Sequence, residues 1–317
     1  MTFLASPCCK SDLELLPKKI EIYENEGKII KEALLICKTC SFEFPVIDGI
    51  PRLDLELSPQ ELTQLKVLKN SDFSSCSGER KFSSEHDRYD EIEKEIRKIM
   101  KVPTESNYLR ERVENDIVYR IKGCELQDKY VQTINSRNQA AIKSILDVGG
   151  MQGGLAKCLD LNYKPDLTII LDKSIDWTHI ALLRNPNAQI IRADAARLPF
   201  KKDSIDLVIS QATLEHIEEY RKVVTEMVKV TKHTCFIAWS PNKLSLYDFG
   251  HLDAPVTLFN KNIAKKVALA WHRMRRTNRS PDSIIRQLDK TFYILKMEDK
   301  TGKIVHHLMV LTMMFSS

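Results

Sequence analysis

The sequence predicts an α/β protein whose doubly wound sheet follows a small β-rich N-terminal module. From residue 144 onward, β-branched runs alternate with helical or loop segments, a rhythm typical of parallel βαβ units; the runs are SILDVGG, TIILDKS, AQIIRAD, IDLVISQ and CFIAWSP. The tail differs, since TFYILKMED and IVHHLMVLTMMF flank a turn at Thr301 and Gly302 and predict a C-terminal antiparallel hairpin. Residues 1–53 instead contain short strands and turns.

Length and composition indicate a globular protein with two folded units. The chain has 317 residues, of which 43 % are hydrophobic, and a common domain has roughly 150. No run of about 18 apolar residues occurs, and the N-terminus MTFLASPCCK does not resemble a signal peptide. We therefore expect a soluble, cytoplasmic protein with no transmembrane segment, whose eight cysteines stay reduced. The net charge of +5 is too small to mark a dedicated nucleic-acid binder.

The composition changes twice along the chain. Residues 1–56 are the β-rich module, which is too small to build a large core alone. Residues 57–106 are charged with helical spacing and predict a helical and mobile linker, whose first helix begins at Ser58 and whose stretch 71–87 is polar. Residues 107–317 would form the α/β domain with its leading helices.

A glycine-rich turn follows the first strand of this domain in the segment SILDVGGMQGGLAKCL. Glycines let the backbone approach a ligand closely, and the helix that follows offers unpaired N–H groups at its N-terminus. A tight turn that holds no ligand would fit the segment as well. Asp172 ends the next strand, where a carboxylate can accept both hydroxyls of a ribose. A cofactor that contains a ribose is therefore expected at this edge. The geometry would suit the dinucleotide NAD as well as a single nucleoside.

Two further segments separate these alternatives. QIIRADAARLPF places Asp194 at the end of the third strand, and KKDSIDLVISQATLEHI supplies the fourth strand and its loop. Together the four segments resemble the ordered motifs of class I S-adenosylmethionine-dependent methyltransferases, most closely the subgroup that includes quinone-biosynthesis methyltransferases. The resemblance covers residues 144–241 and, more weakly, the terminal hairpin. It implies a Rossmann-like seven-stranded doubly wound sheet with S-adenosylmethionine as cofactor.

The resemblance also implies a set of cofactor-binding residues. The glycines would line the methionine end, the acid after the second strand would take the ribose, the acid and alanine after the third would meet the adenine, and a glutamine would lie beside the sulfonium. These residues are Asp147, Gly149, Gly150, Gly153, Asp172, Asp194, Ala195 and Gln211. Met151 stands where the family usually has another glycine, and we expect this departure to affect the affinity for the cofactor more than it affects the fold. No particular catalytic residue is implied, because methyl transfer depends heavily on positioning.

Two N-terminal segments, SPCCKSDLELL and LICKTCSFEFPVIDGIPRL, resemble the short zinc-ribbon family that includes the activator subunit of tRNA and release-factor methyltransferases. Cys37 and Cys40 form a Cys-x-x-Cys knuckle that suits tetrahedral Zn²⁺. The first knuckle departs from the family pattern, since Ser6 stands at the first ligand position while Cys9 keeps the second. Either Cys8 is the fourth ligand, or water or another group completes a three-thiolate site, or the metal is lost. A bound zinc would be structural.

Residues 240–280 lie where class I methyltransferases carry substrate-determining insertions. His251 is a candidate for the substrate pocket. Residues 261–280 contain apolar positions at helical spacing and many basic residues but no acid, which predicts an amphipathic basic helix. Its polar face is a solvated surface, a contact for anionic lipid or a phosphorylated small molecule, or a contact for RNA.

The sequence thus predicts an S-adenosylmethionine-dependent methyltransferase that acts on a small molecule or a lipid- or glycan-linked intermediate, with the zinc-ribbon-like module as an accessory. One alternative is an RNA methyltransferase acting on tRNA or rRNA. Another is a non-catalytic methyltransferase-like binding module, favoured by Met151 in the cofactor turn. The motifs leave the acceptor atom and the oligomeric state open.

Overall fold

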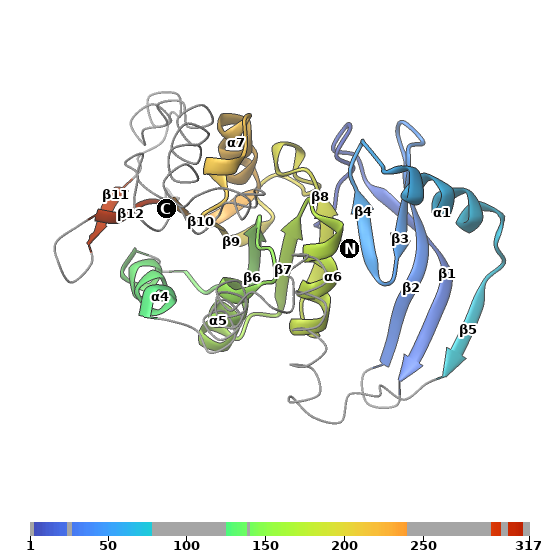
Figure 1. Cartoon of the computed structure of the whole chain (residues 1–317), viewed down its shortest axis with the longest axis horizontal. Helices are drawn as coiled ribbons and strands as arrows, with labels where there is room; N and C mark the ends of the chain where they lie inside the picture. Colours follow the sequence, from blue (N-terminus) through green and yellow to red (C-terminus); the bar gives the residue numbers. More distant parts are fainter. Residues whose placement is uncertain are drawn as a thin grey trace, which may run out of the picture.

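The C-terminal half of the chain is built on a seven-stranded sheet. The computed structural model describes residues 3–23, 27–77, 125–137, 140–239, 293–298 and 304–312. The strands of this half are β6 (Ser144–Val148), β7 (Leu167–Asp172), β8 (Gln189–Ala193), β9 (Ile205–Gln211), β10 (Thr231–Trp239), β11 (Tyr293–Glu298) and β12 (Ile304–Thr312). They lie in the order β11-β12-β10-β9-β6-β7-β8 (Figure 1).

The strand directions match the prediction. β6 to β10 pair in parallel, whereas β12 runs antiparallel to both β10 and β11. The seven-stranded doubly wound sheet and its terminal hairpin are therefore confirmed. The chain first winds outward from β6 to β8 and then returns to place β9 on the other side of β6. Ligands of such sheets bind at this reversal, outside the carboxyl ends of the strands.

Helices cover both faces of the seven strands. On one face, α4 (Glu125–Arg137) and α5 (Gly154–Tyr163) share a buried cluster that includes Tyr130 and Ile145. On the other face, α7 (Tyr220–Val230) contributes Val224 to a cluster with Leu146. Ile145 and Leu146 are neighbours in β6, so their alternation assigns one residue to each layer. The remaining helix, α6 (Ile175–Arg184), packs on β7 and β8.

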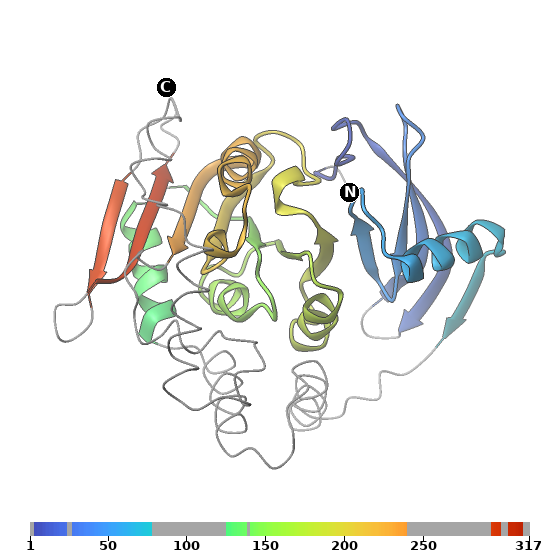
Figure 2. The same ribbon diagram turned by 45° about the horizontal axis from the view of Figure 1, so that its top comes forward.

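The N-terminal module continues the same sheet. Its strands are β1 (Leu13–Tyr23), β2 (Gly27–Cys37), β3 (Glu43–Ile47), β4 (Ile50–Leu53) and β5 (Ser74–Ser77). β4 pairs in parallel with β8, so that all twelve strands form one sheet, which ends in the order β8-β4-β3-β2-β1-β5. Figure 2 shows these blue strands on the side of the molecule opposite the red hairpin. The predicted β-rich module is thus present, and it is joined to the C-terminal half through backbone hydrogen bonds between β4 and β8.

Two local features of the module follow from its sequence. Asp48 and Gly49 both have positive φ, +51° and +80°, as the tight turn between β3 and β4 requires. The long β1 is a single strand whose register with β2 shifts between Pro17 and Lys19. A proline has no N–H to give to a ladder, so the strand continues past Pro17 through an irregularity.

The helix expected at Ser58 is α1 (Pro59–Asn70). The Ser58 hydroxyl accepts the Glu61 N–H, and a Glu61 carboxylate oxygen accepts the Ser58 N–H at 2.7 Å. This capping box and Pro59 at the first helical position start the helix where the sequence predicts. α1 packs through Leu68 on Leu34 and Ile47 of β2 and β3. Among the described residues, no helix has the length and apolar character needed to cross a membrane.

A buried carboxylate ties the amino-terminal edge of the large sheet together. One oxygen of Asp206 accepts the N–H groups of Lys143 and Ser144, each at 3.0 Å, and the Ser144 hydroxyl. Its other oxygen lies 3.4 Å from the Lys232 ammonium. Burial raises the pKa of Asp206, but these hydrogen bonds and the Lys232 charge outweigh it, so that the pKa is lowered.

We expect Asp206→Asn to lower the free energy of unfolding by about 1–3 kcal/mol at pH 7, because hydrogen bonds to an ionised acceptor are lost. Since folding lowers this pKa, the contribution is complete above the unfolded pKa of about 4 and disappears as pH falls through the folded value. Urea unfolding of both proteins at pH 7 and pH 3 measures it. A stability difference that stays constant with pH contradicts the assignment.

Candidate functional site

The turn between β6 and α5 is held against the neighbouring strand by its own backbone. The N–H groups of Gly149 and Gly150 both donate to the carbonyl of Leu171, at 2.8 and 3.2 Å. Gly153, at φ +74°, closes the turn by donating to the Gly150 carbonyl at 2.7 Å and is the N-cap of α5. The predicted glycine turn therefore lies at the carboxyl end of β6, where the strand order reverses.

Each of the three glycines is needed for a close approach. A Cβ atom on Gly149 would overlap the side chain of Thr213, and one on Gly153 would overlap Ile170. A Cβ atom on Gly150 would lie 2.8 Å from the carboxyl carbon of Asp147, whose buried side chain lies against the turn. No side chain fits at these positions without displacing another group, which explains why the sequence has glycine there.

Asp172, at the end of β7, forms hydrogen bonds with the backbone of the glycine turn. Its two carboxylate oxygens accept different backbone N–H groups, one from Met151 at 3.0 Å and one from Ser174 at 2.9 Å. Burial raises the pKa of this carboxyl, and the N–H donors oppose that shift without cancelling it. The predicted ribose-binding residue is therefore bonded directly to the glycine turn, through the residue that departs from the family pattern.

Met151 adopts the conformation that a glycine would favour. Its φ of +47° is in the left-handed region, which costs an L-residue roughly 1–2 kcal/mol. With its backbone in this region, Met151 donates its N–H to the Asp172 carboxylate at 3.0 Å.

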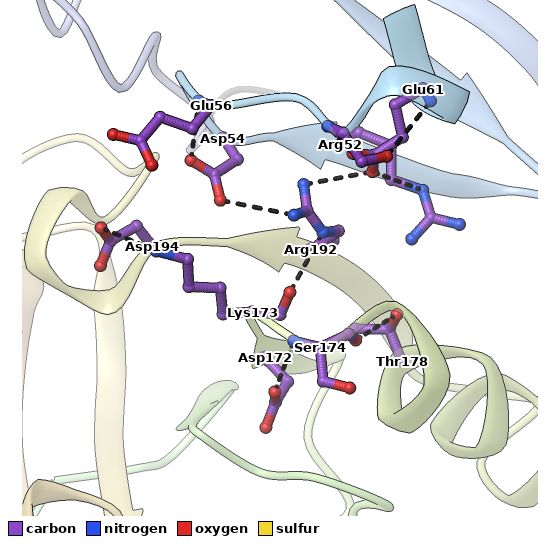
Figure 3. A network of polar contacts seen from close by, with 11 residues as sticks. Arg52, Asp54, Glu56, Glu61, Asp172, Lys173, Ser174, Thr178, Arg192 and Asp194 are labelled. Carbon is purple, nitrogen blue, oxygen red and sulfur yellow. Dashed lines mark hydrogen bonds and ion pairs between the residues drawn. The ribbon is translucent and has the colours of Figure 1, made fainter. Parts of the chain in front are cut away.

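Asp194 and Ala195 follow β8 at the same edge of the sheet. A carboxylate oxygen of Asp194 accepts the Ala196 N–H at 2.9 Å and starts a short 3₁₀ turn, in which Ala195 is buried. The Lys173 ammonium lies 3.8 Å from the other Asp194 oxygen (Figure 3). Lys173 thus bridges the loop that carries Asp172 to the loop that carries Asp194.

Gln211 ends β9 on the far side of the switch point. The Thr213 hydroxyl donates to the carbonyl of Gln211 at 3.0 Å and lies 3.2 Å from that of Gly149, which joins the β9 loop to the glycine turn. Ala212 between them has φ +51°. The structure therefore brings all the predicted cofactor residues to one edge of the sheet, from the ends of four neighbouring strands.

Some sequence predictions lie outside the described residues, namely His251 and the basic helix at 261–280. Conversely, sequence reasoning missed Lys173 and Thr213, which link the loops, and Arg192, which is buried in β8. A signal for Arg192 was present, because it is a charged residue inside the apolar run QIIRA.

Four cysteines come together at one end of the N-terminal module. Cys8 and Cys9 lie before β1, Cys37 ends β2, and Cys40 follows in the next turn. Their sulfur atoms all lie within 4.8 Å of one another, with 2.9 Å between Cys8 and Cys40 and 3.3 Å between Cys9 and Cys37. A zinc ion with Zn–S bonds of about 2.3 Å would hold four sulfurs about 3.8 Å apart. The four thiols thus have nearly the spacing of a tetrahedral ligand set.

Ser6 lies behind this cluster. It is fully buried, and its hydroxyl oxygen is 2.9 Å from the Cys8 sulfur. Burial opposes ionisation of Cys37, yet hydrogen bonds from the Cys40 N–H, the Ser6 hydroxyl and the Thr39 N–H lower its pKa to about 6. The cluster therefore stabilises a thiolate, which is the form that binds metals. Cys8 is therefore the fourth candidate ligand of the group, and Ser6 is not a member of it.

The chain is similar to known proteins over the strands that carry these residues. Residues 146–238, from β6 to β10, match the family described as "Methyltransferase domain". A demethylmenaquinone methyltransferase from Renibacterium salmoninarum is 31% identical over 83 residues, 26% of this chain and 32% of the relative. The chain thus spans about a third of the length of the curated relative it matches. The strand order and the switch point are those of a Rossmann-like α/β fold. The family match lies within this fold and ends at β10.

Solved structures with similar folds include two methyltransferases. Magnesium protoporphyrin IX methyltransferase from Synechocystis PCC 6803 with bound SAH is 16% identical, with a TM-score of 0.45; the match covers 73% of this chain and 94% of that chain. A complex between the Haloferax volcanii Trm112 methyltransferase activator and a methyltransferase gives 15% identity and a TM-score of 0.43, covering 63% of this chain and 96% of that chain.

Met151 offers a direct test of the turn geometry. We expect Met151→Gly to raise the free energy of unfolding by about 1 kcal/mol, since glycine has no Cβ penalty at positive φ. Met151→Ala is the matched control, because it removes the long side chain but keeps the Cβ, and it should gain much less. Chemical unfolding of the three proteins measures the effect, and equal stability of the Gly and Ala variants would refute the left-handed assignment.

Proposed function

We propose that the chain is an S-adenosylmethionine-dependent methyltransferase that acts on a small molecule or a lipid- or glycan-linked intermediate. The observation that carries the proposal is the convergence, at one switch point, of the glycine turn, the Asp172 carboxylate and the Asp194 loop within a methyltransferase domain. Gly149, Gly150 and Gly153 would receive the methionine end, Asp172 the ribose, Asp194 and Ala195 the adenine, and Gln211 the region of the sulfonium. Asp147 would belong to the same cofactor site.

The geometry of Asp172 fits a ribose. Each of its oxygens already accepts one backbone N–H, and each keeps a further lone pair for a hydroxyl donor. The two N–H bonds also hold the carboxylate in one orientation before any ligand arrives. A pre-oriented acceptor loses little entropy on binding, which favours affinity.

The chemistry asks little of the protein beyond positioning. S-adenosylmethionine supplies an activated methyl group on a sulfonium, and transfer requires the acceptor atom in line behind that methyl. In this chain the loop after β9, with Gln211 and Thr213, lies against the glycine turn and would therefore adjoin the bound cofactor. These residues would orient the ligand and exclude water rather than carry a covalent step.

Two observations support a small molecule as the substrate. The curated relative is named for demethylmenaquinone, a small molecule, and is 31% identical to this chain over 83 residues. The mildly basic net charge of +5 also gives no reason to prefer a nucleic acid. Methylation of tRNA or rRNA is the competing outcome, and mass spectrometry of RNA nucleosides from a deletion strain separates the two: a lost modification would overturn the small-molecule proposal.

The cysteine cluster fits a structural zinc ion held by Cys8, Cys9, Cys37 and Cys40. Four sulfurs at near-tetrahedral spacing leave no open position for a substrate, so the metal would stabilise the module and take no part in methyl transfer. The alternative of a three-thiolate site does not account for the place of Cys8 within the cluster.

We expect isothermal titration to detect S-adenosylmethionine binding to the full chain, and Asp172→Asn to raise the dissociation constant about tenfold or more, because a charge-assisted bond to the ribose is lost. Asp206→Asn, at the opposite edge of the sheet, is the matched control and should leave the constant unchanged. Absence of binding by the wild-type chain at millimolar ligand would disprove the proposal.

For the metal, we expect about one zinc per purified chain, measured by elemental mass spectrometry, and a marked loss of zinc in Cys8→Ala. Cys158→Ala, on α5, should keep the metal and controls for the loss of a thiol as such. Full zinc occupancy in the Cys8 variant would show that Cys8 is not a ligand, and a metal-free wild type purified without chelators would exclude the site.

A further inference from the structure

Four charged side chains are buried where the N-terminal module meets the methyltransferase domain. They are Arg52, Asp54, Glu61 and Arg192, and none is more than 6% exposed. Three of them come from β4, the loop after it and α1, whereas Arg192 comes from β8 (Figure 3). Their formal charges balance. The cluster therefore forms a closed ionic contact between the two halves of the sheet.

Arg192 is the centre of this cluster. One of its terminal nitrogens lies 3.1 Å from Glu61, and the other lies 3.7 Å from Asp54. Its Nε–H donates in a different direction, to the carbonyl oxygen of Lys173 at 3.1 Å. Lys173 lies between Asp172 and Ser174. The peptide group that accepts the Arg192 hydrogen bond is therefore part of the loop that carries Asp172, the predicted ribose-binding residue (Figure 3).

The cluster is poorly suited to stabilising the fold. Arg52 and Arg192 are direct neighbours across the β4–β8 pairing, so their like charges lie side by side, and burial together with Arg192 lowers the pKa of Arg52 despite Glu61. Within the described residues, several buried atoms of the cluster, including Arg52 Nε and Asp54 Oδ2, have no hydrogen-bond partner. Buried ion networks of this kind add little net stability and are often replaceable by apolar residues.

The planar fork of arginine explains what the cluster achieves instead. A guanidinium can face two carboxylates with its terminal nitrogens while its Nε–H points elsewhere, and these directions are rigidly coupled. Asp54 and Glu61 attract the terminal nitrogens of Arg192 as ion pairs without a hydrogen bond, whereas its Nε–H makes a hydrogen bond to the Lys173 carbonyl. The three contacts together orient the guanidinium toward the Lys173 peptide. Glu61 is itself held by the capping box of α1 through Ser58. A continuous chain of contacts thus runs from α1 to Asp172.

We propose that Arg192 is a positioning residue for the cofactor site: clamped by Asp54 and Glu61 of the N-terminal module, it holds the Lys173 peptide and thereby sets the orientation of Asp172 toward the ribose. This inference rests on the proposed function, since it assumes a ribose at Asp172. It gives the N-terminal module a defined part in cofactor binding, although none of the module's residues needs to touch the cofactor.

The test measures the affinity of the full chain for S-adenosylhomocysteine by isothermal titration, with thermal stability recorded in parallel. Arg192→Lys keeps the charge but not the fork, so one ammonium cannot serve Lys173, Asp54 and Glu61 together. We expect it to raise the dissociation constant about tenfold, the effect of losing one well-oriented polar contact. Asp206→Asn, a buried carboxylate of the same sheet, controls for lost stability alone and should change the constant less than about twofold.

Two further variants make the result specific. Glu61→Gln, in the N-terminal module, should raise the dissociation constant in the same direction as Arg192→Lys, and it decides the question if the latter does not fold. Combined with Asp172→Asn, Arg192→Lys should add less than about twofold, because both changes weaken the same interaction between residue 172 and the ribose.

The outcomes separate the inference from the proposed function. A wild-type chain that fails to bind the ligand overturns both. A wild-type chain that binds, together with folded Arg192→Lys and Glu61→Gln variants of unchanged affinity, overturns the positioning role alone. Equal effects of the Arg192 variant and the Asp206 control at matched loss of stability overturn it too, since they would reflect stability rather than position.

Discussion

The parallel pairing of β4 with β8 is the contact on which the rest of the architecture depends. Through it, Arg52 and Leu53 lie beside Arg192 and Ala193, and twelve strands become one sheet. The hydrophobic core crosses the same boundary, because Leu53 of the module and Leu146 of the domain belong to one buried cluster. A module too small to fold around its own core thereby acquires one, and the domain acquires a rigid neighbour beside its cofactor loops.

The contacts that run from α1 through Arg192 and Lys173 end at Asp172, which has two competing roles. As a structural group it accepts the Met151 and Ser174 N–H groups and shapes the turn; as the expected ribose ligand it must stay ionised in a partly buried place. Met151 illustrates the compromise. Its left-handed backbone costs stability, but the same conformation directs its N–H to the carboxylate. The methionine at this position therefore carries a backbone strain that a glycine would not have.

The fold and the place of the site could be predicted because their signals are local. Strand alternation, the glycines around Gly150 and the acids at strand ends all report on residues close in sequence, and parallel winding brings strand ends to one edge. The link between the halves could not be predicted, since nothing near residue 52 or 192 says that these strands are partners. Cys8 is an intermediate case: its neighbour Cys9 made several ligand sets conceivable, and only the folded turn places four sulfurs together.

The joined sheet also changes what its borders expose. Alone, the methyltransferase domain would end at β8, a strand whose last four residues are buried and whose free N–H and C=O groups would invite pairing with another chain. The module covers that border and shifts it to β5, which has only four residues and begins with two exposed serines. A short, polar edge strand is a poor template for pairing with another chain. Among the described strands, those of the module therefore also protect the sheet against aggregation through its edge.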